Sequence, residues 1–152
     1  MLLRTDILAT LIIAVIVLHQ GQTTPAIGFS AAVSKNTNLG DNQAVQYDRV
    51  LTNIGNGYDK WSGHFTAPLK GLYHFSCSVM AVGDHYIAVM MVKNGKGIAY
   101  AHSSWSAWES GAMSVVLALK KGDKVWIRRY HGDRFLHGSY NLFSGYLISR
   151  QI

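Results

Sequence analysis

Residues 71–82 read Gly-Leu-Tyr-His-Phe-Ser-Cys-Ser-Val-Met-Ala-Val, and this stretch decides the fold class. Every second residue from Tyr73 to Ala81 is apolar or aromatic, whereas the positions between them, from His74 to Met80, are mostly polar. Side chains of a β-strand point alternately to its two faces, so this period of two predicts a strand with one face in a core and the other in solvent.

The neighbouring segments continue the β pattern. Residues 85–93 are almost continuously apolar and end at Asn94-Gly95, which predicts a strand buried on both faces followed by a hairpin. Residues 27–33, 47–51, 112–119, 124–130 and 140–148 also show strand patterns, separated by Gly, Asn and Asp. With about eight or more short strands, we expect an all-β fold, a two-sheet antiparallel sandwich or jelly roll.

Composition sets the class of protein. The chain has 152 residues, of which 49% are hydrophobic and 14% charged, and a single cysteine, Cys77. Charged residues fall well below the usual quarter, which excludes a disordered chain. Nucleotide-binding, zinc-protease and nucleophile-elbow motifs do not occur, and the only Glu is Glu109, so we expect no enzyme and no cofactor. A lone cysteine is expected to be a buried free thiol rather than an intermolecular bridge.

The N-terminal region predicts export. Arg4 precedes an apolar run over residues 7–18 and a polar stretch over residues 19–24, which is the pattern of a signal peptide. A membrane anchor is the alternative, but twelve residues at about 1.5 Å each are shorter than the roughly 30 Å hydrocarbon core. We therefore expect a signal peptide over residues 1–23, a globular domain over residues 24–152, and a secreted, extracellular protein that does not span the membrane.

The net charge is +6 at pH 7 with histidine neutral. This surplus attracts the protein to anionic surfaces such as envelope phosphates or acidic glycans, by a force that salt screens. The alternative is that the surplus charge only keeps the domain soluble and has no charged partner. We predict no specific nucleic-acid partner.

One block of the chain carries an ordered set of aromatic residues with one Asn and one Gly: Tyr47, Asn53, Tyr58, Phe65, Gly71, Tyr73 and Phe75. The chain opens with Phe29-Ser30-Ala31 and closes with Phe143-Ser144-Gly145-Tyr146-Leu147. These blocks, in this order, resemble the globular C1q domain family, which shares a jelly roll with the tumour necrosis factor ligands. Two positions depart from the family pattern: Tyr47 stands where Phe is usual, and Cys77 where an aromatic residue is.

The resemblance implies a homotrimer with Phe65, Tyr73, Phe75 and Tyr146 in the core. The sequence has no collagen repeat, so it is most similar to the secreted members without a stalk, many of them lectin-like immune proteins. This implies innate immune pattern recognition, in which a trimer binds microbial lipopolysaccharide, peptidoglycan or glycans. The alternative is a secreted trimeric receptor ligand or matrix protein. Some members bind calcium, but no motif here supports a calcium or other metal site.

Two segments supply candidate ligand-binding residues. One contains Arg128, Arg129, His131 and Arg134, and guanidinium groups suit phosphate or carboxylate. Because side chains alternate between the two faces of a strand, we expect Arg128 and Arg129 on opposite faces. The other contains Trp105 and Trp108 among small polar residues, where exposed rings would stack on sugars. An ordinary solvated face for the arginines, and core positions for the tryptophans, are the alternatives.

Overall fold

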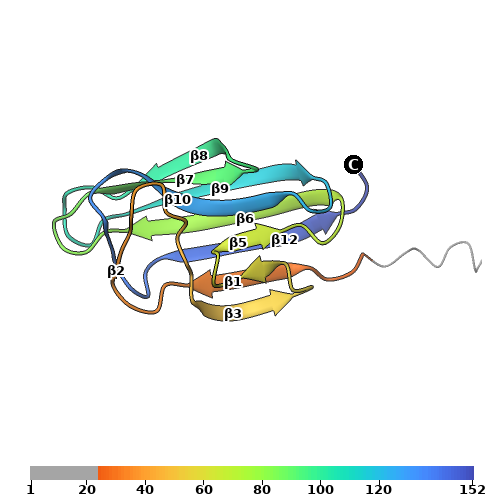
Figure 1. Cartoon of the computed structure of the whole chain (residues 1–152), viewed down its shortest axis with the longest axis horizontal. Coiled ribbons are helices and arrows are strands. Elements are labelled where there is room, and N and C mark those ends of the chain that lie inside the picture. The colour runs from red at the N-terminus through yellow and green to blue at the C-terminus, as the bar shows by residue number, and fades with distance from the viewer. Residues whose placement is uncertain (1–23) are drawn as a thin grey trace, which may run out of the picture.

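The computed structural model describes residues 24–152 and shows two five-stranded antiparallel sheets packed face to face (Figure 1). The predicted signal peptide over residues 1–23 lies outside the described residues. Within residues 24–152 there is no helix that is long and apolar enough to cross a membrane. The all-β jelly-roll prediction is confirmed.

Sheet I has the strand order β3-β1-β12-β6-β9. Its strands are β1 (Gly28–Ala32), β3 (Arg49–Ile54), β6 (Gly71–Met80), β9 (Ser110–Leu119) and β12 (Leu142–Ser149).

Sheet II has the order β4-β5-β10-β7-β8. Its strands are β4 (Tyr58–Asp59), β5 (His64–Thr66), β7 (Ile87–Lys93), β8 (Lys96–His102) and β10 (Lys124–Gly132), while β2 (Thr37–Asn38) and β11 (Phe135–Leu136) form a separate small pair.

The core between the sheets is mainly aromatic. The Phe29 ring stacks on Tyr58 with centroids 4.7 Å apart and on Phe65 at 5.2 Å, and it meets Phe143 edge-on at 4.8 Å. Such stacked and edge-on pairs add stabilisation beyond the apolar area they bury. Because these rings come from both sheets, they join the two layers into one core.

Three residues of the ordered set from Tyr47 to Phe75 hold the turn before β4. The side chain of Asn53 accepts a hydrogen bond from the backbone N–H of Tyr58 at 3.1 Å and donates one to the Tyr58 carbonyl at 2.8 Å. The Tyr58 hydroxyl donates in turn to the carbonyl of buried Tyr47 at 3.2 Å. Tyr47 therefore lies in a buried loop, and the strand expected from residue 47 begins at Arg49.

The predicted alternation of β6 is confirmed, since Tyr73, Phe75 and Cys77 are buried and point into the core. Met80 departs from it, since its side chain is buried. Its backbone is held by Asn141, which accepts a hydrogen bond from the Met80 N–H at 2.8 Å and donates to the Met80 carbonyl at 3.0 Å. Cys77 is a free, buried thiol as expected, and burial raises its pKa to about 12. It therefore stays protonated and unreactive near neutral pH. β7 is buried on both faces and ends in the predicted hairpin.

The expectation that Tyr146 belongs to the core is wrong. Its side chain is 51% exposed on the outward face of sheet I. In β12 the residues that face inward are Phe143 and Gly145, so Tyr146 has the opposite parity. Gly145 is required there, because a Cβ atom would lie 2.4 Å from the Phe75 ring and 2.9 Å from the Phe29 ring.

We therefore expect Gly145→Ala to destabilise the fold by about 1–3 kcal/mol through overpacking of these rings. Chemical denaturation followed by tryptophan fluorescence measures the change. Gly40→Ala is the matched control, because its Cβ would meet no core ring and only one side chain, that of exposed Gln43, at 3.1 Å from Oε1 and 3.7 Å from Cβ. Equal stability of the two variants would contradict the assigned role of Gly145.

Candidate functional site

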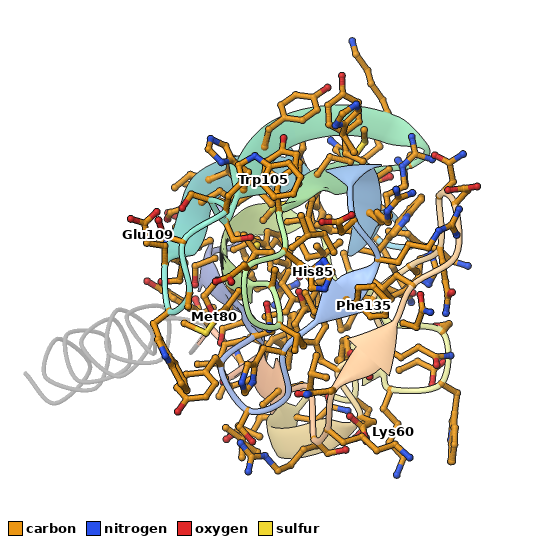
Figure 2. All side chains as sticks on the ribbon, turned by 90° about the vertical axis from the view of Figure 1, so that its left-hand side faces the viewer. Lys60, Met80, His85, Trp105, Glu109 and Phe135 are labelled. Carbon is orange, nitrogen blue, oxygen red and sulfur yellow. The ribbon has the colours of Figure 1, made fainter. Side chains whose placement is uncertain are left out.

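Three loops gather at one end of the sandwich, opposite the end where the C-terminus lies (Figure 1). They connect β6 to β7, β8 to β9, and β11 to β12. Figure 2 looks onto this end, with Met80, His85, Trp105, Glu109 and Phe135 labelled on it. Both predicted ligand-binding segments reach this region. Loops at the end of a rigid sandwich are a common place for binding residues.

Two of the predicted arginines are tied to a carboxylate. Arg129 Nη1 lies 2.6 Å from Asp41 Oδ1, and Arg134 Nη2 lies 2.9 Å from both Asp41 oxygens. Arg129 also donates to the carbonyl oxygens of Asp133, at 2.9 Å, and Gly132. The side chain of Arg129 is only 14% exposed. These contacts give Arg129 a structural role and leave Arg134 partly neutralised.

Arg128 and His131 occupy different surroundings. As predicted, Arg128 faces away from Arg129, and its Nε lies 3.3 Å from the sulfur of Met90 on the outward face of sheet II. A bulge follows in β10 between Arg129 and His131, which changes the pairing with β7. A bulge re-aims the side chains beyond it. The His131 ring consequently lies 6.2 Å from the Tyr86 ring.

The Trp105 ring packs on Tyr86 at 5.4 Å and is 64% exposed. Its loop is anchored nearby by buried Ser103, whose backbone N–H donates to the Ile87 carbonyl at 3.0 Å and whose hydroxyl accepts from the Ile87 N–H at 3.2 Å. This pair of bonds joins the loop to β7. Trp105 therefore projects into solvent from a fixed base.

These contacts continue along the outward face of sheet II. The centroids of the Tyr100 and Tyr130 rings are 5.1 Å apart, and both residues are more than half exposed. The centroids of the Tyr130 and His131 rings are 6.5 Å apart. His102 lies 5.8 Å from Tyr86. The resulting aromatic surface consists of Tyr86, Tyr100, His102, Trp105, Tyr130 and His131.

The strands that carry residues of the aromatic surface, β8 and β10, contain no acidic residue. Strands β7, β8 and β10 contain Lys or Arg but no Asp or Glu, and the one acidic strand residue of sheet II, Asp59, lies in β4 at the edge of the sheet. The nearby carboxylate of Asp133 accepts hydrogen bonds from the Tyr86 N–H and from His85 Nδ1, both at 3.1 Å, and these bonds lower its pKa. The exposed rings therefore form an apolar surface with the Arg128 guanidinium group beside it, while Glu109, in the same loop as Trp105, accepts a hydrogen bond from Ser104.

Trp108 lies apart from this surface. It is 69% exposed, and its ring lies 5.9 Å from His137 and 5.8 Å from Tyr140. Its backbone has φ of +71°, which is rare for a bulky residue. Thus the structure brings Trp105, His131 and Arg128 to one surface and puts Trp108 with another group of rings.

Three residues of these surfaces, Tyr86, Tyr100 and Tyr140, were not predicted from the sequence. His102, Tyr130 and His137 lie within or next to the two predicted segments but were not among the candidate residues. The alternation within residues 96–102 could have indicated that Tyr100 and His102 share a face. The hairpin predicted at Asn94-Gly95 indicated that β8 pairs with β7, but the sequence had no signal that β7 pairs with β10, and both pairings are needed to join these rings. Within residues 24–152, no three His, Cys, Asp or Glu side chains are grouped so as to hold a metal ion.

The outward face of sheet I, unlike that of sheet II, is almost without charged residues. Its five strands contain one Lys, Arg, Asp or Glu residue, Arg49, and one histidine, His74. The strand register aligns a row of hydroxyl residues across all five strands: Thr52, Ser30, Ser144, Ser76 and Ser114.

The next row of this face includes Ile54, Tyr146, His74 and Val116. Ile54, Tyr146 and Val116 are each more than half exposed, and a hollow of about 430 Å³ lies over β6, β9 and β12. An exposed apolar face of this size on a folded domain indicates contact with another protein surface.

Comparison with known proteins finds a family model that matches most of this chain. Residues 28–148 match the family model described as the C1q domain. The chain is 33% identical over 114 residues to complement C1q tumor necrosis factor-related protein 3 of Mus musculus, covering 70% of this chain and 45% of that protein. It is 28% identical over 131 residues to one of the polypeptides of the complement C1q subcomponent of Homo sapiens, covering 84% and 52%. The chain thus spans about half the length of these relatives.

Solved structures agree on the fold. The globular domain of zebrafish complement 1qA protein superposes with a TM-score of 0.68 at 23% identity, covering 82% of this chain and 98% of that one. Murine APRIL superposes with a TM-score of 0.65 at 14% identity, covering 81% and 99%. At these identities the likeness concerns the fold alone.

The Asp41 ion pairs generate a testable pH dependence. The hydrogen bond from Arg134, with the charges of Arg134 and Arg129, lowers the pKa of Asp41 in the folded protein. The ionised carboxylate therefore stabilises the fold above about pH 4, and this contribution is lost as the pH falls through the lowered pKa. We expect Asp41→Asn to reduce the melting temperature at about pH 7 and to have no effect near pH 2.

Thermal unfolding of both proteins across this pH range measures the effect. Asp84→Asn is the control, because Asp84 is exposed and makes no ion pair within residues 24–152. A difference between Asp41→Asn and the unsubstituted protein that persisted at low pH would contradict the assignment.

Proposed function

This chain belongs to the C1q domain family, and from that premise we propose that it acts outside the cell as a homotrimer that recognises molecules on microbial surfaces. The observation that carries the proposal is the aromatic surface, which is exposed, free of acidic strand residues and built on a rigid sheet. The predicted signal peptide, which lies outside the described residues, is part of this proposal.

The uncharged face of sheet I supports the assembly. Desolvating a charged residue at an interface is costly unless it is paired, and this face carries only Arg49 at its edge strand and His74 near its centre. Hydroxyl and apolar side chains are easily covered by a second copy of the chain. We propose that sheet I forms the trimer contacts, which leaves the outward face of sheet II in solvent.

The aromatic surface supports recognition. Tyr and Trp offer large rigid rings at low entropic cost, and an exposed ring presents a flat apolar face to a pyranose. Arg128 beside them adds a donor for phosphate or carboxylate. Three copies on one trimer would raise apparent affinity for a repeating surface by about two to four orders of magnitude without any new contact. This is a binding function, and we propose no catalytic step.

A receptor ligand or matrix protein is the second candidate. Tyr, Trp and Arg are enriched at the centres of protein interfaces, and the aromatic surface with Arg128 beside it has this composition. Host-cell binding is therefore one arm of the test below.

Recognition is tested with the purified domain against lipopolysaccharide, peptidoglycan, mannan and fixed host cells at two salt concentrations. We expect saturable binding to microbial ligands, and we expect Trp105→Ala to weaken it by about tenfold or more. Trp61→Ala is the matched control, because Trp61 is 76% exposed on the turn between β4 and β5, away from the aromatic surface.

Binding that depends on electrostatic attraction weakens steeply as the salt concentration rises, whereas stacking on a neutral sugar does not. Binding to host cells with no microbial binding would replace the proposal by the receptor-ligand alternative.

Assembly is tested by placing a charge on sheet I. We expect Val116→Asp to convert the protein from about three chains to one in solution, because the carboxylate would be buried at the contact with only one ionisable neighbour, its cross-strand partner His74. Light scattering coupled to size-exclusion chromatography measures the mass, and circular dichroism verifies the fold. Lys96→Asp, at the exposed β7–β8 hairpin, should remain trimeric. An unchanged mass for Val116→Asp would exclude sheet I as the contact face.

A further inference from the structure

A small cavity lies at the loop end of the sandwich, separate from the aromatic surface. Its volume is about 90 Å³. Its lining comes from the end of β6, the loop after β6, the β8–β9 loop and the β11–β12 loop: Met80, Ala81, Gly83, Ala107, Trp108 and His137. Figure 2 shows Met80 at this end, below the loop that carries Glu109.

The walls of the cavity determine the chemistry of what fits it. Among residues 24–152, no Asp, Glu, Lys or Arg lines it, and the lining side chains other than His137 are apolar. A water molecule occupies about 30 Å³ in the liquid, so the cavity has room for a group of a few non-hydrogen atoms. A small neutral group with an apolar part is therefore the complementary ligand.

His137 supplies one defined polar atom. Its Nδ1 lies 2.7 Å from the carbonyl oxygen of Gly138. A carbonyl oxygen only accepts hydrogen bonds, so Nδ1 carries the proton and Nε2 of the neutral ring is left as an acceptor. The backbone of His137 is fixed as well, because its N–H donates to the Met80 carbonyl at 2.9 Å and its carbonyl accepts from Asn141. The acceptor is held in place before any ligand arrives.

Trp108 forms the remaining wall and extends beyond it. Its backbone has the unfavourable φ of +71°, yet most of its ring is exposed, so burial of the ring does not explain the conformation. Tyr140 meets both Trp108 and His137 edge-on, with centroids 5.8 and 4.8 Å away. An indole held in this way offers a flat face next to a cavity too small for a sugar ring.

We propose that this cavity binds the acetamido group of an N-acetylated hexosamine. The methyl group occupies the space beside Met80 and Ala107, the amide N–H donates to His137 Nε2, and the pyranose ring lies against Trp108. This inference rests on the proposed function, because it names a ligand class for the recognising protein. It puts a second sugar-binding position beside the aromatic surface, at a site that carries no charge.

The test is a titration of the full folded protein with the trisaccharide of N-acetylglucosamine, followed by isothermal calorimetry and tryptophan fluorescence. The trisaccharide of glucose, which lacks the acetamido group, and the deacetylated trisaccharide of glucosamine are the comparison probes. We expect binding of the N-acetylated probe only, with little dependence on salt because no charged residue lines the cavity.

Two variants locate the binding. We expect Trp108→Ala to weaken affinity by about tenfold or more, through loss of the stacking face. Ala107→Leu fills the cavity from an exposed position, so it should weaken binding to a similar extent without disturbing the core. Trp61→Ala and Trp105→Ala should bind the probe as the unsubstituted protein does. The melting temperature of each variant verifies its fold.

The outcomes separate this inference from the proposed function. Equal binding of the glucose trisaccharide, no binding of the N-acetylated one, or unchanged affinity in both Trp108→Ala and Ala107→Leu would overturn the inference. Microbial binding that Trp105→Ala abolishes would stand in each of those cases. Conversely, N-acetyl-dependent binding that Trp108→Ala abolishes, in a protein whose binding to the microbial panel is unaffected by Trp105→Ala, would uphold the cavity site and reject recognition by the aromatic surface.

Discussion

The packing of aromatic rings around Phe29 is the constraint on which the rest of the structure depends. Phe29 touches rings from both sheets, and it fits only because Gly145 has no side chain at the point of closest approach. The inward half of every long strand is committed to this core. Because side chains alternate, the outward half of the same strands is left to form two separate surfaces, one neutral on sheet I and one aromatic and basic on sheet II.

The core and the strand pattern could be predicted from the sequence because they depend on local periodicity. The alternation in β6 and the hairpin at Asn94-Gly95 needed no knowledge of distant segments. Tyr146 shows where such reasoning fails: its segment was correctly assigned to a strand, but its parity is set by the register of β12 against β6, which the sequence does not display. An aromatic residue within a block that resembles the family is therefore not always a core residue.

The candidate site was less predictable, and the arginines show why. Arg129 and Arg134 suggested an anion site by their type and clustering, yet both bind Asp41, which lies about ninety residues earlier in the chain. The residue type indicates what a side chain is able to bind, while tertiary contacts determine whether it is free to do so. The same argument applies to Trp105 and Trp108, which are three positions apart but belong to different groups of rings.

The division of labour between the two sheets has a consequence for how such a domain diversifies. Substitutions at outward positions of β8 and β10 change the proposed recognising surface while leaving the inward residues and all of sheet I untouched. With the proposed trimer contacts on sheet I, a lineage can therefore acquire new ligands by altering one set of alternate positions and keep its subunit assembly. The same separation makes the outward face of sheet II a convenient place for designed libraries, since each variant would display three identical copies of its new surface.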